Sequence, residues 1–201
     1  AMQLPDFVKD PAPILPLLEM LKDDEEEYVR RSVANNLNDI AKDHPDRVAK
    51  IAGQWLAGAS KDRKKLVNHA CRTLIKKGHQ KTLKALGYGP ARIELKKLKI
   101  LTARVAFGDA LLFELCLTST SKKPQPLIID YAIHHRKANG STTAKVFKWK
   151  KITLESCATL SAKRKHAIKK ITTRVYYPGT HKLEIMVNGV SLGTKTFKLV
   201  M

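Results

Sequence analysis

The feature that most constrains the fold is a change in the spacing of apolar residues at residues 87–90, Gly-Tyr-Gly-Pro. Before this segment, apolar residues recur three and four positions apart, which is typical of amphipathic helices. After it, they alternate with polar residues, which is typical of strands with one buried face. We therefore predict a multidomain chain, α then β, with a helical domain over residues 1–88 and a β domain over residues 91–201.

The charge of the chain is divided unevenly between these two parts. Residues 1–88 hold 16 Lys and Arg against 12 Asp and Glu, whereas residues 89–201 hold 22 against 6. Four fifths of the net charge of +20 therefore belongs to the second part. Such an excess of cations predicts an acidic macromolecule as partner, nucleic acid above all.

Several classes of protein are disfavoured by the same sequence. The three cysteines are scattered and form no CxxC pair, which disfavours a disulfide framework. Apolar runs are too short for a membrane span, and the first residues lack a signal-peptide pattern. His134 and His135 are adjacent in a predicted strand and would point to opposite faces, so we expect no metal site there. We expect a cytoplasmic protein without metal or cofactor.

The first part reads as HEAT-like α-helical repeats. Pro11 and Pro45 lie 34 residues apart, and each opens an amphipathic segment. The five predicted helices cover residues 11–21, 26–42, 45–56, 62–77 and 80–86. Only about two and a half units are present, which predicts a chain truncated at its N-terminus. A short but complete chain is the alternative.

Two of these helices are predicted to present a polar face to one groove. Their buried stripes are Val29, Val33, Leu37 and Ile40 in the first, and Leu66, Ala70 and Leu74 in the second. The opposite faces carry the candidate DNA-binding residues Arg31, Asn35, Asn38 and Lys42, and Lys65, Asn68, Arg72 and Lys76. Cations and amides of this kind suit a phosphate backbone. An ordinary solvated face is the alternative.

Asp39 is a carboxylate within this cationic face. It weakens the attraction for phosphate, which suggests a chemical role. One such role is to stabilise positive charge on a sugar, and another is to position an attacking water. The alternative is a surface aspartate paired with Arg31, Asn35 or a neighbouring helix.

The second part reads as an immunoglobulin-like β-sandwich. Apolar residues alternate along residues 111–117, 127–133 and 183–187, and further strands are predicted at 92–99, 103–107, 143–153, 158–162, 166–171 and 191–200. Asn139-Gly140 and Asn188-Gly189 are typical of tight hairpin turns. Residues 177–181 resemble the corner that enters the next-to-last strand of such domains, with His181 where a tyrosine is more usual.

Basic residues of the sandwich cluster in loops and at strand ends. Lys148 and Lys150 are the candidate DNA contacts there, on either side of Trp149. Trp149 either stacks on a sugar or base, or packs in the core.

Three stretches of the sequence, residues 27–45, 67–78 and 176–181, resemble the DNA alkylation repair family. More narrowly they resemble the AlkC branch of HEAT-like-repeat DNA glycosylases, in which an immunoglobulin-like domain follows the repeats. The resemblance implies excision of N-alkylated, cationic bases, of the 3-methyladenine or 3-methylcytosine type, from duplex DNA. Asp39 occupies the position of the family's catalytic aspartate, and Arg72 that of an arginine that holds the backbone beside the lesion. The family's active site also takes an aromatic residue and a second acid from preceding helices, and these have no counterpart in this sequence.

The predicted partner is therefore duplex DNA with alkylated bases, with no membrane and no obligate protein partner. A non-catalytic DNA-binding or damage-sensing module is the alternative, because it needs only the basic sandwich and the groove. A protein–protein adaptor is a further alternative, since helical repeats often serve that purpose.

Overall fold

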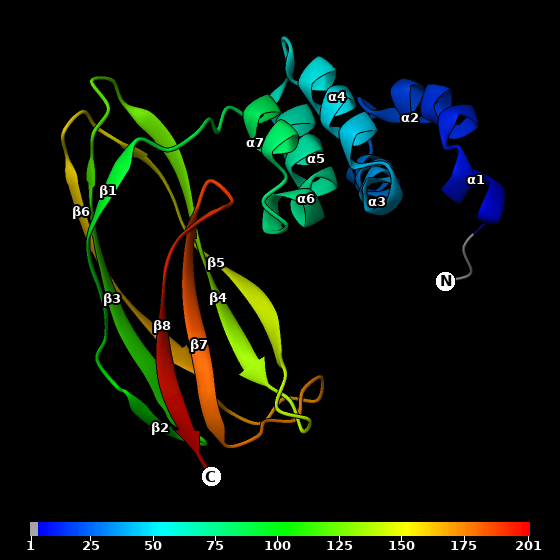
Figure 1. The fold of residues 1–201 in the computed structure, drawn as a ribbon. Coiled ribbons are helices and arrows are strands. Elements are labelled where there is room, and N and C mark those ends of the chain that lie inside the picture. Colours follow the sequence, from blue (N-terminus) through cyan, green and yellow to red (C-terminus); the bar gives the residue numbers. More distant parts are fainter. Residues whose placement is uncertain (1–3) are drawn as a thin grey trace. The chain divides into compact units, whose positions relative to one another are not determined.

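The computed structural model describes residues 4–201, which form two compact units, the first ending at Gly89 and the second beginning at Pro90 (Figure 1). The predicted order of a helical region followed by a β-sandwich is confirmed. None of the helices among the described residues is long and apolar enough to cross a membrane.

The helical unit contains seven α-helices and one 3₁₀ turn within the described residues. They are α1 Pro5–Lys9, η1 Ala12–Ile14, α2 Leu15–Leu21, α3 Glu27–Asp43, α4 Pro45–Leu56, α5 Lys61–Ala70, α6 Arg72–Lys76 and α7 Gln80–Ala85. Helix α1 was not predicted, and the segment predicted as 11–21 begins as the 3₁₀ turn. The segment predicted as one helix over 62–77 is two helices, because the backbone at Cys71 leaves helical geometry, with φ −86° and ψ 3°.

Helix α3 packs its apolar stripe against the other helices of this unit. Its fully buried residues are Val33, Ala34, Leu37, Asn38 and Ala41. Helix α4 buries Trp55, whose indole N–H donates to Glu19 of α2 over 2.5 Å. Burial of these side chains fixes which stripe of α3 remains accessible.

Helix α5 begins with a side-chain cap. The Ser60 hydroxyl accepts a hydrogen bond from the Arg63 backbone N–H over 3.1 Å, which satisfies one donor that has no partner within the helix. We expect Ser60→Ala to lower the free energy of unfolding by about 1 kcal/mol. Urea unfolding of both proteins checks this value, and Ser60→Gly should cost only a few tenths of a kcal/mol. An Ala variant as stable as the original would contradict the capping role.

The sandwich consists of two sheets (Figure 1). The first has the strand order β1-β3-β6 and contains β1 Ile93–Ile100, β3 Ala110–Ser119 and β6 Thr159–Ala167. The second has the order β2-β8-β7-β4-β5 and contains β2 Arg104–Ala106, β4 Gln125–Arg136, β5 Thr142–Leu154, β7 Gly179–Val187 and β8 Val190–Val200. The two strands predicted at 158–162 and 166–171 are one strand, β6, followed by a loop.

Aromatic rings fill the space between the two sheets. Phe113 packs edge-on against Tyr131 and Trp149, with centroids 5.3 and 5.2 Å away. Trp149 is half-buried and packs against the core, as one of the two alternatives held.

The corner and one of the two predicted Asn-Gly turns follow the predicted chemistry. At Asn139-Gly140 only Gly140 has positive φ, 80°, and the loop between β4 and β5 spans residues 137–141, so the prediction of a tight hairpin turn there was wrong. Asn188 and Gly189 both have positive φ, 47° and 75°, as the tight turn between β7 and β8 requires. His181, 1% exposed, donates from Nε2 to the Tyr177 carbonyl over 3.0 Å, so the ring binds the backbone four residues upstream. This is the bond that a tyrosine makes in the corresponding corner of immunoglobulin domains.

Candidate nucleic-acid interface

The exposed stripe of α3 carries three of the four residues that were predicted on this helix for the groove, together with Asp39. Arg31, Asn35, Asp39 and Lys42 are all exposed and follow one another at helical spacing. Asn38 does not belong to this stripe, because it is 4% exposed. Its placement on the polar face was wrong, since its amide oxygen accepts a hydrogen bond from the Thr73 backbone N–H over 3.3 Å.

Asp39 lies at the edge of a cavity of about 540 Å³ between the C-terminal half of α3 and the segment from Leu4 to Ile14. Its Oδ1 pairs with the Lys42 ammonium over 2.7 Å, and 69% of its side chain is exposed. Asp39 pairs along its own helix, and not with Arg31, Asn35 or a neighbouring helix as the surface alternative held. The cavity walls combine apolar and polar groups, namely Leu4, Phe7, Val8, Pro11, Ile14 and Ile40 with Asn36, Asp43 and His44.

Arg72 donates two hydrogen bonds, one to α3 and one to α5. Its Nη2 donates to Asn35 Oδ1 over 3.1 Å, and its Nη1 donates to the His69 carbonyl over 2.8 Å. The helix break at Cys71 makes this arrangement possible, because the His69 carbonyl lies at the end of α5. Asn35 and Arg72, which the sequence analysis placed in one groove, are therefore in contact.

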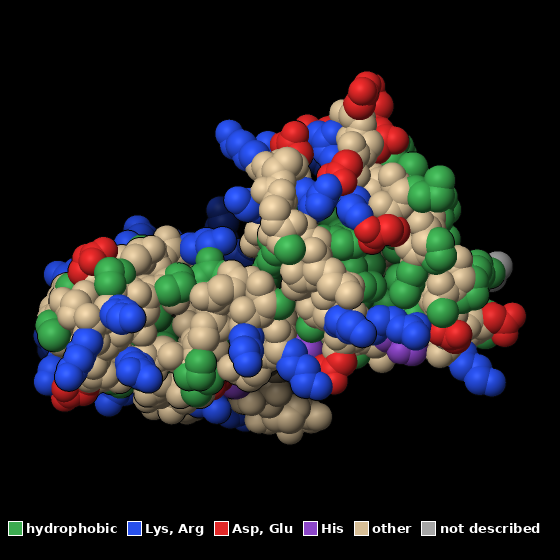
Figure 2. Space-filling model, turned by 90° about the horizontal axis from the view of Figure 1, so that it is seen from above, with side chains coloured by type: hydrophobic (Ala, Val, Ile, Leu, Met, Phe, Trp, Pro, Cys, Tyr) green, Lys and Arg blue, Asp and Glu red, His purple; other side chains and the backbone are tan. Residues whose placement is uncertain are grey.

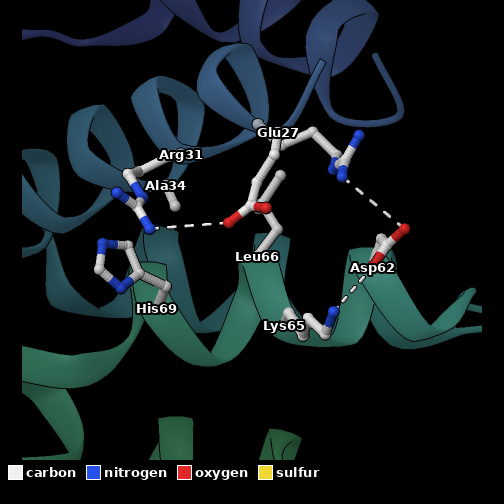
Figure 3. A pocket seen from close by; sticks show the side chains of 8 residues that line it. Glu27, Arg31, Ala34, Asp62, Lys65, Leu66 and His69 are labelled. Atoms are coloured by element: carbon white, nitrogen blue, oxygen red, sulfur yellow. Dashed lines mark hydrogen bonds and ion pairs between the residues drawn. The ribbon is translucent and has the colours of Figure 1, made fainter. Parts of the chain in front are cut away.

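A second, smaller pocket of about 210 Å³ lies between α3 and α5 (Figure 3). Arg31 points into it from α3, and Lys65 and His69 from α5 (Figure 3). Two carboxylates neutralise part of this charge: Glu27 pairs with Arg31 over 3.6 Å, and Asp62 pairs with Lys65 over 3.2 Å. The pairing with Lys65 is the largest cause of the lowered pKa of Asp62.

The other predicted residues of α5 and α6 lie apart from these contacts. Asn68 is half-buried and donates to the Lys64 carbonyl over 2.8 Å, within its own helix. Lys76 is exposed in the last turn of α6.

The sequence analysis missed His69, which lines the pocket and donates from Nε2 to Asn35 Oδ1 over 3.0 Å. A sequence signal for it exists. His69 follows Asn35 by 34 residues, the same interval that separates Pro11 from Pro45. Residues one repeat apart lie beside each other in stacked repeats, so the period itself pairs His69 with Asn35.

The sandwich surface is strongly basic (Figure 2). Lys148 and Lys150 are exposed on β5 on either side of a bulge, where the β4–β5 register shifts between Ile129 and Asp130. Lys148 lies opposite Asp130 and Lys150 opposite Ile129, so Trp149 is the extra residue of the bulge between two exposed lysines. Both positions suit contact with a phosphate backbone.

Two of the four histidines of the sandwich, His135 and His181, are buried, and the other two are half-buried. His134 pairs with Glu184 over 2.7 Å, while His135 turns inward beside Tyr176, with centroids 5.4 Å apart. Burial lowers the pKa of His135 to about 3 and that of His166 to about 4. No group of three His, Cys, Asp or Glu among residues 4–201 is arranged to hold a metal ion.

Comparison with known proteins gives three concordant matches. The family model described as the C-terminal Ig-like domain of uncharacterised protein YhaZ matches residues 94–201. Uncharacterized protein YhaZ of Bacillus subtilis (strain 168) is 41% identical over 187 residues, which are 92% of this chain and 52% of that protein. The alkylpurine DNA glycosylase AlkC of Pseudomonas fluorescens, bound to DNA containing an abasic site analog, matches with a TM-score of 0.95 and 37% identity. That match covers 100% of this chain and 56% of AlkC, so the chain spans about half the length of both relatives.

Proposed function

The chain belongs to the YhaZ C-terminal Ig-like domain family, and from this premise we propose that its function is that of a DNA glycosylase, the excision of N-alkylated, cationic bases from duplex DNA. The observation that carries the proposal is the match to AlkC along the whole chain, helices and sandwich together. We take the residues of the exposed α3 stripe as the candidates for the site.

Hydrolysis of the N-glycosidic bond of a cationic base requires few catalytic groups from the protein. A 3-methyladenine or 3-methylcytosine base carries a positive charge, so it leaves as a neutral base when the N-glycosidic bond breaks and takes the bonding electrons with it. The positive charge then develops on the sugar, as in an oxocarbenium ion. Attack of water on that carbon, with loss of a proton, leaves an abasic site. No cofactor is needed for these steps.

Asp39 is our candidate for the catalytic carboxylate. Its charge stabilises the cationic sugar or positions the water, and the adjoining cavity provides an apolar wall for the lesion nucleotide. Arg72, which two hydrogen bonds hold in place, is the candidate for binding the DNA backbone beside the lesion. Lys42 lines the same cavity, and Arg31 and Lys65 are candidate DNA contacts at the smaller pocket between α3 and α5.

The proposed partner is duplex DNA, and the proposed location is the bacterial cytoplasm, where the chromosome lies. The direct test incubates the protein with methylated duplex DNA and measures released 3-methyladenine and 3-methylcytosine by chromatography. Release above that from DNA alone supports the proposal. Tight, salt-dependent binding without release would favour the non-catalytic DNA-binding module instead.

The sandwich lysines give an independent prediction. We expect Lys148→Gln and Lys150→Gln each to reduce the slope of log K against log salt for duplex binding by about 0.9, because each variant neutralises one phosphate fewer. The matched control is Lys96→Gln, since Lys96 already pairs with Glu94 over 2.7 Å. Fluorescence anisotropy at several salt concentrations gives the slopes. Unchanged slopes for both β5 variants would remove this part of the sandwich from the interface.

A further inference from the structure

One side-chain oxygen joins two successive repeats of the helical unit. Asn35 Oδ1, on α3, accepts hydrogen bonds from His69 Nε2 over 3.0 Å and from Arg72 Nη2 over 3.1 Å. The donors come 34 and 37 residues later in the chain, from α5 and α6. Asn35 itself is exposed, so burial in the core does not explain this arrangement.

These bonds fix the orientation of both donors. A guanidinium is planar, so the bonds from Nη1 and Nη2 together set its plane and leave its remaining N–H groups for another acceptor. An amide oxygen can only accept, so His69 carries a proton on Nε2, and the ring orientation follows from that bond.

We infer that Asn35 is a positioning residue, which acts on DNA through Arg72 and His69 and not by its own contact with the backbone. The inference rests on the proposed function and deepens it. Arg72 and His69 are held in place before DNA arrives, so binding does not have to order them. The sequence analysis assigned Asn35 a direct DNA contact, but its oxygen already has two donors.

The salt dependence of binding separates the two roles. Loss of an arginine–phosphate contact lowers the log–log slope by about 0.9, because one phosphate fewer is neutralised. Loss of a contact from a neutral amide weakens binding but releases no counterion of its own. If Asn35 acts by positioning Arg72, then Asn35→Ala must lower the salt slope, although this substitution changes no charge.

The experiment measures binding of a fluorescent duplex with an abasic-site analog to the chain and its variants over a series of salt concentrations. We expect Asn35→Ala to weaken binding about fivefold and to lower the slope by about 0.9, as Arg72→Gln does. The double variant should bind like Arg72→Gln alone, because both changes remove one interaction. Gln54→Ala, which removes the same amide group from an exposed position of α4, is the matched control and should bind as the unaltered chain does.

The outcomes distinguish this inference from the proposed function. Weaker binding with an unchanged slope, or additive effects in the double variant, would overturn the positioning role in favour of a direct contact. An Asn35→Ala variant that binds like the unaltered chain would overturn it as well. Salt-insensitive binding by the unaltered chain would overturn the proposed function, and the inference with it. Thermal unfolding of each variant confirms that the fold is retained.

Discussion

Replacement of Asp39 by Asn is expected to reduce the release of methylated bases by about 10²-fold or more while leaving DNA binding intact. Removing one preorganised electrostatic group from an active site typically costs about 10² to 10³ in rate. Asn has the size of Asp but no charge, so the cationic sugar loses its stabilising partner. Binding should not weaken, because the variant removes a negative charge from a surface that faces phosphates.

The measurement compares single-turnover release of 3-methyladenine from methylated duplex DNA, and the affinity for a duplex with an abasic-site analog. Glu25→Gln is the matched control, because Glu25 is an exposed carboxylate in the turn before α3 and lies outside the cavity. Equal release by the Asp39→Asn variant and the unaltered protein would remove Asp39 from the mechanism. A parallel loss of binding and release would point to an altered structure.

The sequence predicts the two folds well, because each depends on a periodic pattern. Alternation in residues 111–117 and 127–133 indicates strands β3 and β4, whose inward residues fill the core. Asn188-Gly189 specifies its turn through backbone sterics alone, and both residues have the expected positive φ. Local physical chemistry suffices for features of this kind.

Two errors in the helical unit have a common origin in a contact between helices. The spacing of apolar residues predicts one helix that continues through Cys71, and it places Asn38 on the polar face. In the structure the helix is interrupted at Cys71, and the Thr73 N–H at the start of α6 donates to Asn38. A buried amide is stable where it satisfies a backbone group. No pattern within a single helix reveals that partner, which lies 35 residues away.

The sandwich is expected to lose much of its stability in mild acid, by about 4 kcal/mol between pH 7 and pH 5. Burial lowers the pKa of His135 to about 3 and that of His166 to about 4, against about 6.5 in an unfolded chain. Below pH 6.5 the unfolded chain therefore binds protons that the folded sandwich does not bind. Below pH 6.5 each histidine lowers the free energy of unfolding by about 1.4 kcal/mol per pH unit. The full stability is therefore present only above about pH 6.5.

The contacts of these rings explain why protonation is resisted. His166 Nδ1 lies 2.9 Å from the Tyr131 hydroxyl oxygen in the core, and after burial itself the nearby cations Arg164, Lys145 and Arg174 oppose a positive charge on the ring. His135 Nδ1 is buried and makes no hydrogen bond to any described residue, so a charge there would have no partner. Burial also lowers the pKa of His181, whose Nδ1 accepts from the Arg136 backbone N–H over 3.4 Å.

Urea unfolding at pH 7, 6 and 5 tests this expectation. The chain has two tryptophans, Trp55 in the helical unit and Trp149 packed against the sandwich core, so Trp55→Phe leaves a reporter for the sandwich alone. The Trp149 transition should move to lower urea with each step toward acid. In a His135→Phe background the shift should be about half as large, because one of the two most strongly perturbed groups no longer titrates. A midpoint independent of pH from 7 to 5 would show that these histidines bind protons equally well in the folded and unfolded chain.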